Sequence, residues 1–257
     1  MCKSLNLSIT VKNDEINYGS ERFFSNETEL LDDYLHTLFM NGQIYLDYHL
    51  IKVCDHEYTA FVNVPDIKSI ESKFNNEYVN RSYKYLTVKI EKSDKNILYS
   101  HNCNCNDILY YILQGSSEFG TASPVTCGKC GYEVPLYKIP HLFCEQEHFS
   151  LLSWQKCYAS VENLWINSLS DRFTKNQLNN PASALNKTAF ELRQELEKKI
   201  GKPVYLELSK TELPISSVKE QDDVLCPRCC QKMTKCEYQV FSGKMYKCDI
   251  CRVINIK

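Results

Sequence analysis

The sequence predicts an α+β protein in which small cysteine-paired modules follow a larger N-terminal domain. Strand-like and helix-like stretches alternate over residues 1–95, and most cysteines beyond residue 96 come in close pairs. The charge is also divided unevenly, because the segment from Cys226 to the end carries a net +5 and residues 1–225 carry −7. We therefore expect an acidic body with a basic C-terminal module.

The N-terminal domain, residues 1–95, is expected to contain four strands and two helices. In order, the pattern predicts a strand at 4–11, a helix at 27–40, strands at 43–53 and 57–64, a helix at 65–79 and a strand at 83–91. Ser25 or Asn26 is the expected cap of the first helix, and Gly42 follows its end. The order β-α-β-β-α-β predicts a ferredoxin-like fold.

The remaining chain is expected to form three further segments. Residues 96–150 are rich in Gly, Ser, Pro and Cys, which predicts a small zinc-knuckle module held by something other than a large core. Residues 151–221 predict a helical region with one strand, namely a helix at 151–169, a helix that starts at Asn179-Asn180-Pro181 and stops at Gly201, and a strand at 203–209. Residues 222–257 form the last module, after a polar linker.

Eight of the 14 cysteines stand two or three positions from a partner, which is the spacing of thiolate metal ligands. In the last module these are Cys226, Cys229, Cys248 and Cys251, with 18 residues between the pairs. Four thiolates close a tetrahedral zinc shell and leave no position for water. We therefore predict a structural zinc ribbon, with a hairpin turn at Ser242-Gly243 between its strands.

A second zinc site is expected in the central module, where Cys127 and Cys130 form another CxxC pair. Its upstream partners are predicted to be Cys103 and Cys105. Three competing interpretations stay open: a site that uses downstream His141, Cys144 or His148, one that uses His101, and no metal at all. The other six cysteines are expected to be ordinary thiols, namely Cys2, Cys54, Cys144, Cys157, Cys230 and Cys236.

The sequence gives no support for an enzyme. It has no GxSxG, no phosphate-cradling glycine loop and no HExxH, and both cysteine clusters are expected to be saturated. His49 and His56 are interpreted as solvated residues at a hairpin. No uninterrupted apolar run reaches membrane-spanning length, and the N-terminus lacks the pattern of a signal peptide, so a cytoplasmic protein is expected.

Four stretches within residues 100–257 carry a resemblance, and they are SPVTCGKCGYEVPLYKIPH, EHFSLLSWQKCYASVENLWINS, GKPVYLEL and CPRCCQKM…KCDICRVINIK. In this order they resemble a bacterial family of zinc-ribbon-containing proteins of uncharacterised function. The resemblance implies metal binding at Cys127, Cys130 and the four terminal cysteines. The family is commonly described as a candidate nucleic-acid-binding one, but that description is itself an inference from the ribbon.

These features indicate two functions, and an unrecognised enzyme stays open as a third interpretation. The first is binding of a protein partner, for example by an immunity protein that neutralises a basic nuclease toxin, because the acidic body would attract such a partner. The alternative is nucleic-acid binding through the basic ribbon. The residues expected to carry that alternative are Lys232, Lys235, Lys244, Lys247 and Tyr246.

Overall fold

The computed structural model describes residues 3–12, 24–96, 102–115, 123–208, 224–236 and 245–256. The chain forms two compact units that do not follow chain order: residues 1–102 with 135–148, and residues 103–134 with 149–257. Both units combine helices with a sheet, so the predicted α+β class is confirmed. The finer division at 95, 150 and 221 stays a prediction.

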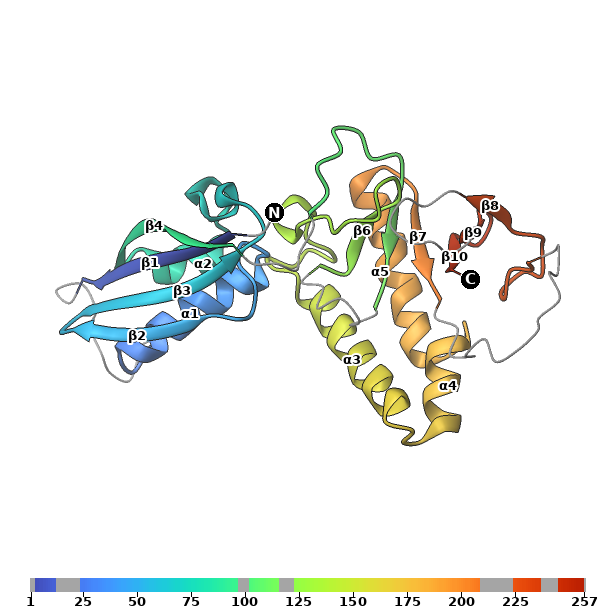
Figure 1. Ribbon diagram of the computed structural model, residues 1–257, viewed down its shortest axis with the longest axis horizontal. Coiled ribbons are helices and arrows are strands. Elements are labelled where there is room, and N and C mark those ends of the chain that lie inside the picture. Colours follow the sequence, from blue (N-terminus) through green and yellow to red (C-terminus); the bar gives the residue numbers. More distant parts are fainter. Residues whose placement is uncertain are drawn as a thin grey trace. The chain divides into compact units, whose positions relative to one another are not determined.

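The first unit contains a four-stranded sheet and two α-helices. Its elements are β1 (Lys3–Val11), α1 (Glu27–Met40), β2 (His49–Cys54), β3 (Glu57–Val64), α2 (Glu77–Tyr83) and β4 (Leu86–Asn96). The strand order is β2-β3-β1-β4, and every neighbouring pair is antiparallel. Alternate residues of β1 are buried, and α1 and α2 cover the same face of the sheet (Figure 1). The period-two pattern of the sequence therefore marks the core side of the strand.

The predicted helix at 65–79 is wrong. The Asp66 carboxylate accepts a hydrogen bond from the Lys68 backbone N–H, which starts a 3-10 turn at Ile67–Ile70, and a second turn spans Ser72–Phe74. The Asn76 side chain then caps α2 by accepting from the Val79 N–H. Periodicity alone predicts one continuous helix here. Two short polar side chains instead accept backbone hydrogen bonds, and each of them starts a new helical segment. The predicted strand at 43–53 likewise begins only at His49.

The second unit is built on a six-stranded sheet of order β6-β5-β7-β10-β9-β8. Its strands are β5 (Tyr111–Leu113), β6 (Val125–Cys127), β7 (Val204–Glu207), β8 (Thr234–Cys236), β9 (Met245–Cys248) and β10 (Val253–Ile256). Strand β7 is parallel to both of its neighbours, β5 and β10. One strand thus joins the central cysteine module and the C-terminal module in a single sheet. The predicted turn at Ser242-Gly243 lies outside the described residues.

Three helices accompany this sheet: α3 (Phe149–Ile166), α4 (Asp171–Asn179) and α5 (Ala184–Ile200). The sequence did not predict α4, which follows two left-handed serines, Ser168 and Ser170. The start predicted at Asn179 is wrong, because Asn179 ends α4 and the Ser183 side chain caps α5. The predicted end of α5 at Gly201 is confirmed by its left-handed φ of 72°.

Candidate metal centres

The central module brings four thiols together: Cys103, Cys105, Cys127 and Cys130. Their sulfur atoms all lie within 4.8 Å of one another. Cys103 and Cys105 precede β5, and Cys127 is the last residue of β6, with Cys130 in the turn that follows. The antiparallel pairing of Tyr111 with Cys127 brings the two cysteine pairs to the same end of this hairpin. The grouping is the one predicted from CxC and CxxC.

The C-terminal module forms a second group from Cys226, Cys229, Cys248 and Cys251, again with all sulfurs within 4.8 Å. The Sγ atoms of Cys229 and Cys248 are 3.7 Å apart. Zinc–thiolate bonds of about 2.3 Å in a tetrahedron require sulfurs separated by about 3.8 Å. The site therefore has the dimensions of a four-thiolate zinc shell, and its residues fit that ion.

In both groups two thiols are buried and two are half-buried. Cys127 and Cys226 are almost fully enclosed, whereas Cys130 and Cys251 reach the surface. Both clusters thus lie partly at the surface. Four thiolates are soft ligands, and they bind zinc in preference to hard cations, which prefer oxygen ligands.

The turns at Cys127 and Cys226 have the same backbone design. The Cys127 N–H donates to the Tyr132 carbonyl at 2.9 Å, and the Cys226 N–H donates to the Gln231 carbonyl at 2.8 Å. In each turn the partner is five residues further along the chain. Backbone geometry that recurs at two unrelated positions indicates that the CxxC spacing itself selects this turn.

A left-handed residue follows each CxxC pair. These residues are Gly131 (φ 73°), Cys230 (φ 57°) and Arg252 (φ 54°). Cys230 thus occupies the position that glycine fills in the central site, and it is exposed rather than part of the four-thiol group. The prediction that Cys230 is an ordinary thiol does not include this conformational role. Its place directly after a CxxC pair is the signal that could have revealed it.

The packing role of Tyr110 was also not predicted. A Cβ atom on Gly128 would lie 2.1 Å from its ring, so only glycine fits in this turn. The Tyr110 ring in turn meets Tyr205 of β7 edge-on, with ring centroids 5.3 Å apart. Tyrosine is common in strand-forming sequences, so the residue type at position 110 does not indicate a contact with Gly128 or Tyr205.

The thiols of each group differ in acidity before any metal binds. Burial raises the pKa of Cys103 and raises that of Cys130 to about 11. Burial also opposes ionisation of Cys127, but backbone N–H groups and neighbouring thiols lower its pKa overall. In the other group, the Gln231 N–H is the main reason why the pKa of Cys229 falls to about 7. Each group thus has one thiol with a lowered pKa, and a bound cation would displace the protons of the thiols whose pKa is raised.

The competing ligands of the central site belong to no such group. Within the described ranges, no cluster of three or more metal-ligating side chains includes His141, Cys144 or His148, and His101 lies outside those ranges. His141 bonds the Asn41 side chain at 3.0 Å, and the His148 ring packs against His141. These histidines therefore belong to the polar interior of the first unit.

The residues of the nucleic-acid alternative lie in different environments. Lys232 and Lys235 are exposed, as that alternative requires. Lys247 pairs with Asp249 at 3.1 Å, and Tyr246 packs against the cysteine-lined core of the last module. Lys244 lies outside the described residues. Lys247 and Tyr246 are thus engaged within the protein.

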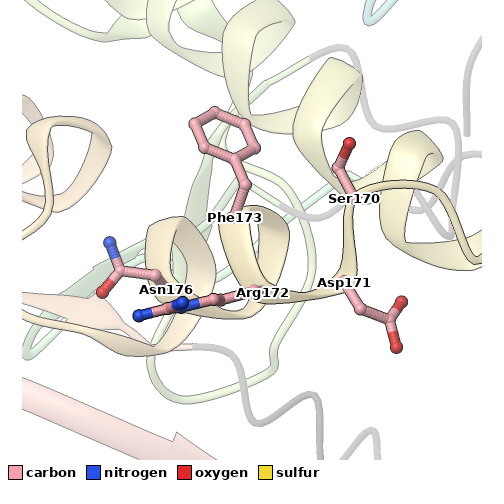
Figure 2. A pocket seen from close by; sticks show the side chains of 5 residues that line it. All are labelled: Ser170, Asp171, Arg172, Phe173 and Asn176. Carbon is pink, nitrogen blue, oxygen red and sulfur yellow. The ribbon is translucent and has the colours of Figure 1, made fainter.

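A shallow hollow lies at the start of α4, lined by Ser170, Asp171, Arg172, Phe173 and Asn176. These side chains point in different directions (Figure 2). Catalysis requires groups that converge on one reacting atom. The hollow therefore gives no ground for assigning a reaction.

Two family models match parts of the chain, and both are described only as domains of unknown function. Residues 105–208 match DUF2310, and residues 15–97 match DUF8589. No curated protein and no solved structure matches the chain. In the part of the chain that the structure describes, no helix has the length and apolar character needed to cross a bilayer. Evidence on function must therefore come from the site itself.

Proposed function

We propose that this chain is a non-catalytic zinc-binding protein that acts by binding a protein partner. The observation that carries the proposal is the pair of closed four-thiol groups. A zinc ion with four protein ligands keeps no open position for water or substrate, and so stabilises a fold instead of activating a molecule. Each site would hold together a small module that has little core of its own.

We assign the C-terminal group to the zinc-ribbon class and the first unit to the ferredoxin-like class. The antiparallel pairing of β8 with β9 and β9 with β10, next to two cysteine turns, supports the ribbon. The strand order β2-β3-β1-β4 and the order of elements along the chain support the second assignment. Both serve as scaffolds, so neither assignment names a reaction.

A surface for a protein partner is offered by the end of α3 and the start of α4, residues 164–173, here termed the helical tip. Its apolar side chains are 39 to 57% exposed, and they are Leu164, Ile166, Leu169 and Phe173. Large apolar side chains that are exposed to water favour docking against another apolar surface. Charged Asp171 and Arg172 adjoin them, as expected at the rim of an interface.

The charge distribution supports one particular class of partner. Residues 1–225 carry a net −7, which would speed association with a basic protein. A toxin such as a basic nuclease, neutralised by this chain as its immunity protein, is one such partner. The described cysteines form no disulfide, which supports a reducing, cytoplasmic location.

Affinity purification from the source cells tests the proposal. The tagged chain should co-purify with one partner at near-stoichiometric yield. The double variant Ile166→Ser with Phe173→Ser, here the tip variant, should not co-purify with that partner. The matched control is Ile51→Ser with Val53→Ser, which removes equally exposed apolar side chains from β2. A wild-type chain that enriches no partner contradicts the proposal, and a partner kept by the tip variant but lost by the control contradicts the choice of surface.

Nucleic-acid binding through the ribbon is the second candidate, favoured by the exposed Lys232 and Lys235. Neutralising both to Gln should weaken retention on single-stranded DNA or RNA, and the affinity should fall steeply with salt. Absence of retention at low salt rejects this candidate without affecting the first.

A further inference from the structure

Arg193, on α5, is a buried guanidinium whose donors are incompletely satisfied. Its side chain is 7% exposed, and its Nη1 donates to Glu197 at 3.0 Å and to the Val204 carbonyl at 3.3 Å. Its Nε is buried and has no hydrogen-bond partner in the described part of the protein. A buried donor without an acceptor is unfavourable, so its position calls for an explanation.

Two further arginines approach Arg193 from the C-terminal metal site. Arg228 lies between Cys226 and Cys229, and its guanidinium stacks over the Phe190 ring of α5 at 4.3 Å from the centroid. Arg252 directly follows Cys251, and its Nε is 3.5 Å from Glu197. Burial lowers the pKa of Arg193, and the charges of Arg252 and Arg228 lower it further against the pull of Glu197. Arg193 therefore lies within electrostatic range of both Arg228 and Arg252.

The carboxylates nearby do not balance this charge. Glu197 Oε2 already accepts from Arg193 and from the Val204 N–H, in addition to its pairing with Arg252. Asp249 is shared between Lys247 and Arg252, at 3.1 and 3.7 Å. Arg228 has no acidic partner among the residues that the structure describes. In the part of the chain that the structure describes, Arg193, Arg252 and Lys247 thus share the carboxylates of Glu197 and Asp249, and Arg228 forms no ion pair.

We propose that Arg193, Arg228 and Arg252 form a binding site for a phosphate group. Guanidinium groups match the oxygens of phosphate through paired N–H donors, and a dianion would offset the excess positive charge. The phosphate oxygens would also give the Arg193 Nε an acceptor. The proposal is independent of the protein-partner proposal, since it concerns a different surface of the second unit.

The site depends on the metal-bound fold of the ribbon. Arg228 and Arg252 both lie in cysteine turns, whereas Arg193 lies on α5, which packs beside β7 (Figure 1). Strand β10 holds the ribbon against β7 through parallel pairing of Val253 with Leu206. Removal of zinc from the C-terminal group should therefore separate the three arginines and abolish phosphate binding.

Calorimetric titration of the full-length, zinc-loaded chain with inorganic phosphate tests the proposal, at an ionic strength held constant with chloride. We expect saturable binding of one phosphate per chain, weakened about tenfold or more by Arg228→Gln at unchanged zinc content. Arg228 is exposed, so its replacement should not unfold the protein. Arg172→Gln, an exposed arginine on α4, is the matched control and should bind phosphate like the wild type.

A parallel titration with a short single-stranded oligonucleotide distinguishes the source of the phosphate. Binding of inorganic phosphate alone supports a small phosphorylated ligand, whereas tighter oligonucleotide binding that Arg228→Gln abolishes supports a polynucleotide backbone at the same site. The proposal is overturned if neither probe binds, if Arg172→Gln weakens binding as much as Arg228→Gln does, or if the zinc-free chain binds phosphate unchanged.

Discussion

Tyr205 on β7 donates a hydrogen bond from its hydroxyl to the carboxylate of Asp249, which lies between the last two cysteines. This bond is the main reason why the pKa of Asp249 falls below its usual range, and Lys247 lowers it further. The Tyr205 ring also meets Tyr110, which packs on Gly128 in the central cysteine turn. The two metal groups are thus connected through a pair of tyrosines.

We expect Tyr205→Phe to accelerate zinc loss from the C-terminal group. The change removes a hydrogen bond to a charged acceptor, worth about 2 kcal/mol, and leaves the ring in place. A chromophoric chelator would measure the rate of zinc release in two phases. The phase from the C-terminal group should be accelerated, and the phase from the central group should be unchanged. Tyr78→Phe in the first unit is the control, and equal release from both variants would contradict the expectation.

Native mass spectrometry should find two zinc ions per chain. Cys248→Ser and Cys103→Ser should each lose one, because three thiolates and a hydroxyl bind zinc more weakly than four thiolates. Cys157→Ser, which replaces an exposed thiol outside both groups, should keep two. A wild-type chain with one ion would disprove the assignment of two zinc sites.

Cys230→Gly should stabilise the ribbon by about 1 kcal/mol. Left-handed backbone is strained for a residue with a Cβ atom and free of strain for glycine. Cys230→Ala keeps the strain and should give no such gain, which separates backbone from thiol effects. Urea denaturation of the zinc-loaded variants measures the difference, and equal stability of Gly and Ala would refute this explanation.

The first unit should lose stability as the pH falls from 6.5 towards 3. Burial lowers the pKa of His148 to about 3, and the nearby His141 adds to the depression while the Leu136 carbonyl opposes it. Between these pH values the unfolded chain binds a proton that the folded chain does not, so the free energy of unfolding decreases by up to about 1.4 kcal/mol per pH unit.

NMR of the imidazole resonances tests this pH dependence directly. The His148 signal, assigned by its absence in His148→Leu, should not titrate between pH 8 and about 4. The same variant should show a flatter stability curve over that range. Titration of the His148 signal near pH 6.5 would show that its ring is accessible to water, contrary to its 1% exposure.

Local patterns in the sequence were sufficient for much of the first unit and for both metal groups. Strand β1 shows its buried face in alternate residues, and a CxxC turn depends only on neighbouring backbone atoms. Periodicity failed between 65 and 79, because Asp66 and Asn76 form backbone hydrogen bonds that a hydrophobic pattern does not contain. It also failed to predict α4, a helix whose residues are mostly polar and exposed.

The sequence by itself determined which cysteines can share an ion, because metal-ligand spacing is a property of short segments. Only the tertiary structure decided that β7 joins the two cysteine modules in one sheet, since strand pairing across about 90 residues leaves no local signature. It also decided that Arg228 and Arg252 of the last module pack against the part of α5 that carries Arg193. No local sequence pattern marks any of these arginines. Their charges can act on one ligand only because folding brings distant segments of the chain together.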